Sequence, residues 1–246
     1  MRDPAVDGWG EGAQVATSSE STAERIADVL RRQITEGDLR PGTQLSEERL
    51  VARLGVSRNT LREAFRLLGH DGLLIHRRHR GVFVPELDED DLIDLFRLRR
   101  TVECDVVRSL KGLDVDRLRP LRADVEAAES AASRGEWGEV ATANIRFHQC
   151  LVSLAGSRRI DDVTRRLLAE LRLAFHVVGS PRVLHERYVG RNHALLDLLE
   201  DGEVERAADE LERYLHDSEE QLLAAYRGRR DAGAARDMIP TDGSTG

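Results

Sequence analysis

The stretch between Gly42 and Val84 constrains the fold of this chain more than any other part of the sequence. Two serines, Ser46 and Ser57, each precede a run in which apolar residues recur with helical spacing, and Gly55 separates the two runs. Serine is a preferred N-cap residue, and glycine commonly stands just beyond the last turn of a helix. The stretch therefore predicts a short helix, a tight turn and a second helix.

Patterns on both sides of this stretch complete a small domain. Apolar residues repeat every four positions between residues 26 and 34, which indicates a helix that begins at about Thr22. Residues 73–75 and 82–84 are apolar and enclose a basic turn, so they are expected to pair as a β-hairpin. Residues 22–85 are therefore interpreted as a winged helix-turn-helix domain, in which the hairpin is the wing.

The rest of the chain shows helical periodicity and no strand signals. Residues 86–227 are expected to form an all-helical domain, for which an antiparallel bundle is the usual architecture. Its first helix would begin near Asp91, and the later helices would span about 114–133, 137–155, 160–178, 181–200 and 204–226. Residues 1–21 and 228–246 lack periodicity and are expected to be disordered tails. The predicted fold class is thus mainly α.

Charge is distributed unevenly between the two expected domains. The formal net charge is −8, yet Thr22–Val84 contains 12 arginines and only eight acidic residues. A basic domain (here called the head, residues 22–85) joined to an acidic one is typical of a protein that contacts DNA through the basic domain alone. Cys104 and Cys150 form no disulfide framework or zinc-finger pattern and are expected to be buried, reduced thiols. Because the sequence shows no signal peptide and no apolar run of about 18 residues, we expect a cytoplasmic protein without a membrane span.

The second helix of the helix-turn-helix carries one basic face. Arg58, Arg62 and Arg66 are spaced by four residues and lie opposite Leu61 and Phe65, which would be buried. A recognition helix presents its N-terminal residues to base edges, and arginine reads guanine through two parallel hydrogen bonds. An ordinary solvated helix face would also carry arginines, but the complete helix-turn-helix and the basic wing favour DNA binding.

Side chains around this helix have the chemistry for the remaining DNA contacts. Asn59 can read adenine, whereas the hydroxyl groups of Ser57 and Thr60, with the free amides at the helix start, suit a phosphate group. Arg49 on the preceding helix would reach the flanking DNA backbone. The wing-tip pair His79-Arg80 is placed for a minor groove or another phosphate.

Several motifs in this block resemble the GntR family of bacterial regulators. They are Gly37-Asp-Leu-Arg-Pro-Gly42, Leu45-Ser-Glu47, Leu54-Gly-Val-Ser-Arg58, Leu61-Arg-Glu-Ala64, Asp71-Gly-Leu-Leu74 and Arg80-Gly-Val-Phe-Val84. The resemblance implies that Arg49, Arg58, Arg62 and the wing glycine Gly81 serve DNA binding in this chain.

The second block resembles the helical effector domain, of the FCD type, that accompanies this head in the FadR-like subfamily. Arg99-Arg-Thr-Val-Glu103 is similar to its opening motif, Phe147-His148 to the Phe-His pair of a later helix, and Gly202-Glu203 with Ala207 to its penultimate turn. The resemblance implies a homodimer that binds a small-molecule effector. Many domains of this kind hold a divalent metal through Asp-x-x-x-His and two further histidines, but here Asn144 stands at the Asp position.

Helix geometry decides which polar residues face the interior of the bundle. His193 and His216 look like obvious metal ligands, but neither shares the apolar face of its helix. His193 is rotated by about 100° from that face, the angle that one residue spans in an α-helix. The inward-facing polar residues are instead Asn144, His148, Asn192 and Tyr214.

Three interpretations of this polar set remain open. It could form a metal site built on His148 with Asn144, a metal-free polar pocket, or a packed core without a small ligand. Because histidine is the single strong ligand for a transition metal in the set, no bound metal or cofactor is expected. Arg99 or Arg172 is expected to lie near enough to pair with an anionic effector, and the forked guanidinium favours a carboxylate.

These features together predict a ligand-responsive transcription regulator, expected to be a repressor, that binds a double-stranded DNA operator. A two-fold symmetric homodimer would match a palindromic operator, and the effector would shift the population between DNA-competent and DNA-incompetent states. Two other classes of protein are alternatives to a transcription regulator. An enzyme is not expected, because the sequence offers no nucleophile–base pair and no phosphate loop. An architectural DNA-binding protein without a ligand would lack the response to an effector.

Overall fold

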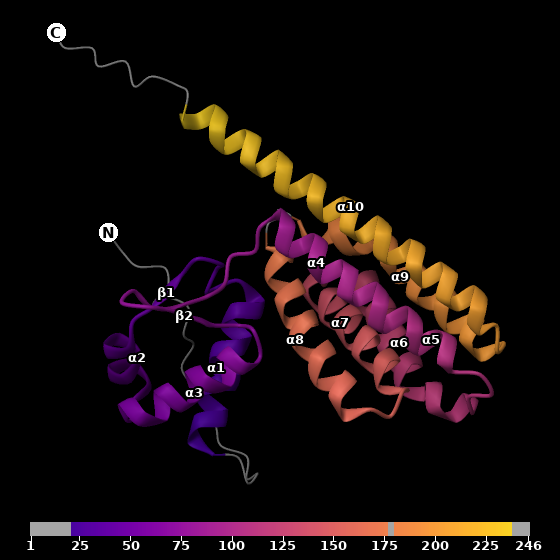
Figure 1. Ribbon diagram of the computed structural model, residues 1–246, viewed down its shortest axis with the longest axis horizontal. Coiled ribbons are helices and arrows are strands. Elements are labelled where there is room, and N and C mark those ends of the chain that lie inside the picture. Colours follow the sequence, from indigo (N-terminus) through magenta and orange to yellow (C-terminus); the bar gives the residue numbers. More distant parts are fainter. Residues whose placement is uncertain (1–20, 177–179, 238–246) are drawn as a thin grey trace. The chain divides into compact units, whose positions relative to one another are not determined.

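The computed structural model describes residues 21–176 and 180–237, which group into two compact units. One unit contains the chain through Leu87 together with Ala155–His176. The other contains Asp88–Leu154 together with the described residues from Ser180 onward. Both units are mainly helical, and the strands that the structure describes lie in the first unit, as Figure 1 shows.

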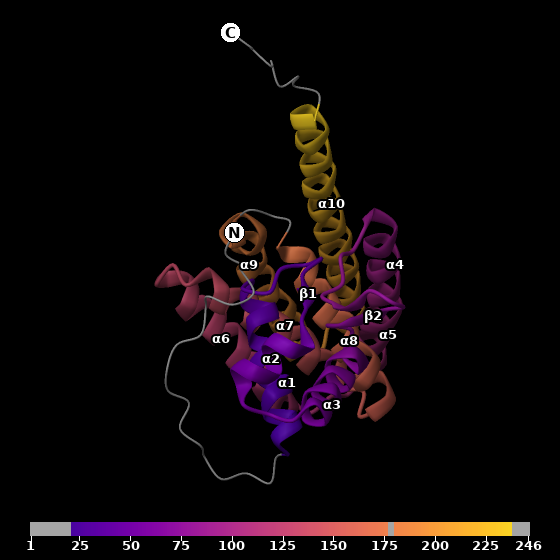
Figure 2. The same cartoon turned by 90° about the vertical axis from the view of Figure 1, so that its left-hand side faces the viewer.

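The first unit contains the predicted helix-turn-helix and wing. Its elements are α1 (Thr22–Glu36), β1 (Gln44–Leu45), α2 (Glu47–Leu54), α3 (Arg58–His70), β2 (Ile75–Arg77), β3 (Gly81–Phe83) and α8 (Arg158–Phe175) (Figure 1, Figure 2). Ser21, Ser46 and Ser57 stand at the starts of α1, α2 and α3, and the side chain of each accepts a hydrogen bond from a backbone amide of the first turn. The capping predicted for Ser46 and Ser57 is therefore confirmed.

The wing is a three-stranded antiparallel sheet with the order β1–β3–β2. β1 extends the predicted hairpin because its two residues pair with Val82 and Phe83. A two-residue strand has no periodicity of its own, so the sequence could not indicate it. The hairpin also begins later than predicted, at Ile75, because Leu73 and Leu74 are buried in the core of the unit instead of pairing in the sheet.

The hydrophobic core of the first unit forms where α1 and α3 pack together. Leu30, Ile34, Leu61 and Phe65 of these helices are buried in it. Leu173 of α8 is 1% exposed and belongs to the same core. The sequence periodicity had grouped α8 with residues 86–227, whereas its contacts group it with the head. Periodicity reveals the apolar stripe of a helix, but it does not specify which surface covers that stripe.

Two side chains from the α8 region also contact the end of α1. The last turn of α1 contains no basic residue of its own. Arg172 donates from Nε to the carbonyl oxygen of Thr35 at 3.4 Å, and His176 donates from Nε2 to the carbonyl oxygen of Ile34 at 3.0 Å. Terminal carbonyl groups of a helix lack intrahelical donors, and a cation near them is favoured by the helix dipole. Arg172 therefore supplies a donor to the Thr35 carbonyl, and His176 adds a second donor to the Ile34 carbonyl, which also accepts from the Gly37 amide at 3.3 Å.

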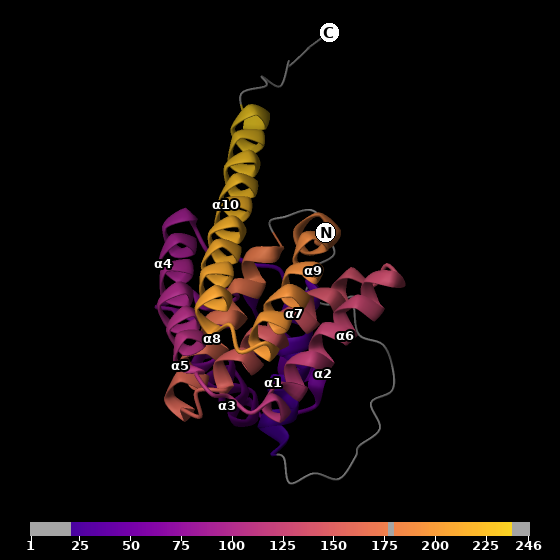
Figure 3. The same cartoon turned by 90° about the vertical axis from the view of Figure 1, so that its right-hand side faces the viewer.

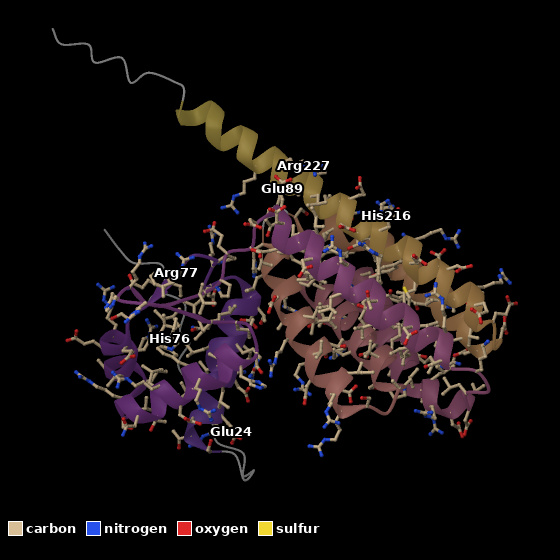
Figure 4. The ribbon with its side chains drawn as sticks, in the orientation of Figure 1. Glu24, His76, Arg77, Glu89, His216 and Arg227 are labelled. Carbon is tan, nitrogen blue, oxygen red and sulfur yellow. The ribbon has the colours of Figure 1, made fainter. Side chains whose placement is uncertain are left out.

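The second unit is an antiparallel helical bundle, as predicted. Its elements are α4 (Glu89–Arg99), the π-helical turn η1 (Arg100–Cys104), α5 (Asp105–Ser109), the 3-10 turn η2 (Val115–Leu118), α6 (Arg119–Ser133), α7 (Trp137–Ser153), α9 (Pro181–Glu200) and α10 (Val204–Asp237). α7 packs against α6 and α9, and α10 packs against α9 and α4 (Figure 3). Figure 4 shows Arg227 of α10 beside Glu89 of α4, where Nε and Oε2 are 2.9 Å apart.

The ends of the chain differ from the prediction where the structure describes them. α10 continues to Asp237, so the tail expected from Gly228 is helical as far as that residue. The reason is local composition, because the alanine and arginine residues of 228–237 are strong helix formers and outweigh the two glycines, Gly228 and Gly233. The remainder of the two predicted tails, residues 1–20 and 238–246, lies outside the described residues. Within the described ranges, no helix is long and apolar enough to cross a membrane.

Replacement of Leu173 by alanine tests whether α8 is part of the core of the head. The change leaves a cavity among residues of α1 and α3, so we expect a loss of about 2–5 kcal/mol in the free energy of unfolding of the first unit. Hydrogen exchange of the α1 and α3 amides measures this loss directly. Val163→Ala is the control, because Val163 also lies on α8 and is 45% exposed. Equal protection in the two variants would contradict the assignment of α8 to the core.

Candidate functional site

The outer face of α3 carries the arginines that the sequence singled out for DNA binding. Arg58, Arg62 and Arg66 are exposed, whereas Leu61 and Phe65 on the other side of the helix are buried. The row of arginines is thus presented to solvent at the surface of the head. This is the arrangement required of a helix that lies in the major groove of DNA.

The start of α3 holds the short polar residues. Ser57 Oγ accepts a hydrogen bond from the amide of Thr60 at 3.1 Å and lies 2.8 Å from the Thr60 hydroxyl oxygen. The Ser57 hydroxyl is therefore engaged in capping α3. A phosphate group would meet it at the start of the helix, which is exposed. Asn59 in the first turn of α3 and Arg49 on α2 are also exposed.

The wing tip is held in a defined conformation by backbone and side-chain contacts. The Arg80 amide donates to the Arg77 carbonyl oxygen at 2.9 Å, and Gln44 Nε2 donates to the Arg80 carbonyl oxygen at 2.7 Å. His79 adopts a left-handed backbone with φ of 60°. Gly81 has φ of 100°, and a Cβ atom there would lie 3.1 Å from Gln44 Nε2. Glycine is therefore required at this position to shape the wing, whatever it contacts.

A groove of about 690 Å³ lies between the wing and the start of α2. Its lining comes from β1, β3 and the first turn of α2, and consists of Thr43, Gln44, Leu45, Ser46, Glu47, Arg49, Gly81 and Val82. The groove brings Arg49 and the wing glycine to one surface of the head. Two of the positions that the family resemblance assigns to DNA binding thus border one concave region.

The interior of the second unit contains a buried ion cluster. Arg99 and Glu103 are 2% and 1% exposed, and Arg99 Nε lies 2.6 Å from Glu103 Oε1. The second Glu103 oxygen, Oε2, lies 2.7 Å from Nδ1 of the equally buried His148. Buried charges are stable in proteins only when they are paired and hydrogen-bonded, and this cluster meets both conditions.

The cluster continues into the polar set predicted from the sequence. His148 Nε2 lies 3.2 Å from the Tyr214 hydroxyl oxygen, which lies 2.9 Å from Asn144 Oδ1. Asn192 Nδ2 donates to the same Asn144 oxygen at 2.7 Å. The side-chain oxygen of Asn192, Oδ1, is buried without a hydrogen-bond partner within the described part of the chain. Asn144, His148, Asn192, Tyr214 and Arg99 are therefore joined in one hydrogen-bonded chain.

The charges of this cluster shift the pKa values of its members. Burial alone would raise the pKa of Glu103, but the Arg99 guanidinium and His148 outweigh burial and hold it at about 2. Burial is the main cause that lowers the pKa of His148 and raises that of Tyr214. Because the folded-state pKa of Glu103 lies below its usual value of 4.5, the stability that its charge contributes is complete above pH 4.5 and is lost as the pH falls toward 2.

Glu103 is the member of the cluster that the sequence reasoning did not select. It lies in the π-helical turn η1, which follows α4 directly, and both Arg99 and Glu103 point into the bundle. The spacing of Arg99 and Glu103 was a usable sequence signal, because an acidic residue four positions after an arginine lies on the same helix face and can pair with it. π-Helical turns occur often at functional sites, but the sequence carries no pattern that predicts one.

The other predicted residues lie outside this cluster. Arg172 belongs to the first unit, where it contacts Thr35, and His176 lies there too. His193 is exposed and pairs with Glu129, with Nδ1 and Oε1 2.6 Å apart. His216 is exposed on α10 (Figure 4). The helical geometry that excluded His193 and His216 from the interior thus agrees with the structure.

The donor atoms of the polar set do not suit a divalent transition metal. Both ring nitrogens of His148 already have partners, Glu103 and Tyr214. The pKa of Tyr214 is raised by burial, so its oxygen remains a phenol, and the amide oxygens of Asn144 and Asn192 are weak ligands for zinc or nickel. Among the described residues, no group of three or more His, Cys, Asp or Glu side chains is arranged to hold a metal ion.

The two cysteines are free thiols. Cys104 is buried as expected, whereas Cys150 is only partly buried, so the expectation that both are buried was wrong for Cys150. Burial is the main cause that raises the pKa of Cys104 to about 12 and that of Cys150 to about 11. The reactive form of a cysteine is the thiolate, so neither side chain has the character of a nucleophile near neutral pH.

Replacement of Glu103 by alanine tests the importance of the buried cluster. The change leaves Arg99 and His148 buried without their carboxylate, so we expect a loss of about 3–5 kcal/mol in the free energy of unfolding. The control is Glu212→Ala, which removes a carboxylate 3.2 Å from Arg108 in a pair whose side chains are 42% and 56% exposed. That surface change should cost about 0–1 kcal/mol. Similar losses in denaturant unfolding of the two variants would show that the buried cluster has no special role.

Comparison with known proteins gives the context for these two sites. The model of the bacterial regulatory proteins of the gntR family matches residues 22–84, and the FCD domain model matches residues 94–217. The chain is 31% identical to the HTH-type transcriptional regulator YdhC of Bacillus subtilis over 54% of its own length and 61% of that protein. It is 28% identical to a protein of Paenarthrobacter nicotinovorans named as a D-xylose utilization operon transcriptional repressor, over 79% and 86% of the two chains.

Solved structures agree with the sequence comparison. The crystal structure of a transcriptional regulator GntR from Rhodococcus sp. RHA1 is 41% identical, covers 83% of this chain and 98% of its own, and superimposes with a TM-score of 0.76. Escherichia coli McbR/YncC, which is 22% identical with a TM-score of 0.72, shows the same fold. The head matches one family model and most of the helical region matches the other. The chain belongs to the GntR family of bacterial transcription regulators and combines its DNA-binding head with an FCD domain.

Proposed function

We propose that this regulator is a homodimeric repressor that binds a palindromic operator through α3 and the wing and responds to a small effector in its helical bundle. The observation that carries the proposal is the α3 face, where an exposed row of arginines lies opposite a fully buried apolar face. A helix of this kind can enter the major groove while its other side remains in the core. DNA binding and transcription regulation follow from membership of the GntR family.

The repressor assignment rests on the names of similar proteins. The relative from Paenarthrobacter nicotinovorans is named as an operon repressor, and so are two gluconate operon proteins of Bacillus that are 30% and 28% identical over about half of this chain. A two-fold symmetric dimer binds two half-sites, which is why a palindromic operator is proposed. Light scattering of the full chain should give twice the mass of one chain, and a monomer at micromolar concentration would remove this part of the proposal.

The polar chain of the second unit is proposed as the effector site. Asn192 Oδ1 supports this proposal, because a buried acceptor without a partner is costly and a ligand with an O–H or N–H group would satisfy it. The carboxylate that the sequence favoured would have to compete with Glu103 for Arg99, since Glu103 already holds that guanidinium. An effector that enters this site would therefore rearrange a buried ion pair, which gives binding a structural consequence.

Two arginine substitutions test the DNA-binding surface. Arg58→Ala should lose roughly 1–3 kcal/mol of binding free energy for duplexes that the protein selects from a random pool, and should relax sequence preference. Arg49→Ala should weaken binding to selected and scrambled duplexes about equally and should reduce the slope of affinity against salt concentration, because a phosphate contact carries no sequence information. Gel shifts at several salt concentrations distinguish the two. Unchanged affinity in Arg58→Ala would remove Arg58 from the base-reading set.

We also propose that the regulator uses no metal cofactor, because the donor atoms of the polar set are weak or already engaged. Elemental analysis of protein purified without added metal should find far less than one zinc or nickel per chain, and added zinc should leave the melting temperature unchanged, since a ligand of the folded state must raise stability. His148→Ala provides the matched control for adventitious binding. About one metal ion per chain in the wild type, lost in that variant, would overturn this proposal.

A further inference from the structure

The arginines of the exposed row on α3 differ in how their guanidinium groups are held. Arg62 donates from Nε to Glu47 Oε2 at 3.0 Å, so the contact comes from α2, the other helix of the helix-turn-helix. Arg66 donates from Nε at 3.1 Å and from Nη2 at 2.6 Å to the two carboxylate oxygens of Glu63, three residues earlier on its own helix. One arginine is thus held at a single nitrogen, and the other along a whole edge of the guanidinium group.

The contact from α2 orients the guanidinium of Arg62 for reading a base. A guanidinium reads guanine when two of its N–H groups point in parallel at O6 and N7. The contact from Arg62 to Glu47 uses the inner nitrogen Nε, which leaves the edge formed by Nη1 and Nη2 directed away from the carboxylate. In Arg66 the carboxylate of Glu63 occupies the edge formed by Nε and Nη2. Both arginines keep the Nη1–Nη2 edge for a base, but Arg62 is oriented by a residue of α2 whereas Arg66 is held only by its own helix.

Glu47 is itself anchored more firmly than an ordinary surface carboxylate. It is the first residue of α2, directly after the N-cap Ser46 and directly beyond β1, whose Leu45 is buried and pairs with Val82. Its side chain is 32% exposed, compared with 64% for Arg62. The carboxylate also belongs to the lining of the groove between α2 and the wing. Sheet pairing and helix capping thus fix the backbone from which Glu47 reaches Arg62.

We propose that Glu47 is a specificity-determining residue of the DNA-binding head, which positions Arg62 for a guanine and opposes binding to DNA that lacks it. The inference rests on the proposed role of α3 as the recognition helix. Holding Nε fixes the plane of the guanidinium, so less side-chain entropy is lost when the base contact forms. The Glu47 carboxylate also repels DNA phosphates at every site, and at a site with the right guanine the Arg62 base contact outweighs that repulsion. Glu47 thereby increases the difference between correct and incorrect sites rather than the affinity for DNA in general.

The experiment compares affinity for two duplexes in gel shifts with the full-length protein. One is a sequence selected by the wild type from a random pool, and the other is a scrambled duplex of the same composition. Glu47→Ala should lower the ratio of the two affinities by at least about fivefold, the lower end of what one bidentate base contact contributes. Affinity for the scrambled duplex should stay the same or rise. Glu47→Gln keeps an acceptor for Nε and should restore part of the ratio.

Two comparisons isolate the action of Glu47 through Arg62. Glu48→Ala removes the same charge from the same first turn of α2 and should leave the ratio unchanged. In an Arg62→Ala background, the added Glu47→Ala change should lower the ratio no further, because the two residues act as one unit. Thermal unfolding of each variant checks that the head remains folded.

The remaining outcomes would overturn the inference, and they can be told apart. An unchanged ratio in Glu47→Ala, or an equal loss of affinity for both duplexes, would show that Glu47 does not set specificity. A further fall in the double variant would show that Glu47 acts on DNA without Arg62. If Arg62→Ala itself leaves the ratio unchanged, the role of α3 in reading bases fails along with this inference. If Arg62→Ala lowers the ratio and Glu47→Ala does not, the proposed function stands and this inference alone fails.

Discussion

The buried pairing of Arg99 with Glu103 is the constraint on which the helical bundle depends. Their side chains are 2% and 1% exposed, so each charge is stable there only because the other lies beside it. Glu103 also holds His148, which orders Tyr214 and through it the two asparagines. The polar chain therefore fixes the orientations of α4, α7, α9 and α10 relative to one another, since each of these helices or the turn that follows it contributes a member. Apolar packing alone would tolerate small rotations of a helix, whereas hydrogen-bond geometry does not.

Local signals in the sequence were sufficient for most of the fold. The starts of α2 and α3 could be predicted because Ser46 and Ser57 act on the amides of their own first turns. Features that depend on distant partners could not be predicted in the same way. β1 exists because β3 pairs with it, and α8 groups with the first unit, where Leu173 joins the hydrophobic core. In both cases the decisive partner lies elsewhere in the chain.

The candidate sites show the same division. Helical geometry placed Asn192 and Tyr214 in the interior and kept His193 and His216 outside, and these placements agree with the structure. Arg172 could not be placed, because its role depends on where α8 packs. Glu103 was missed because a strongly acidic residue is not expected inside a bundle unless its partners are already known. The DNA-binding face was easier to predict, since its residues follow one another along a single helix and need no tertiary information.

A positive charge that is already lodged in the bundle limits how this protein can change during evolution. Burial is the main cause that lowers the pKa of His148, and the Arg99 guanidinium acts in the same direction. A descendant that exchanged Asn144 for aspartate and Asn192 and Tyr214 for histidine would gain metal ligands beside a buried pair whose two charges already balance. Loss of Arg99 first would instead strand Glu103. Arg99 and Glu103 would therefore have to change together, since either charge alone would be buried without a partner.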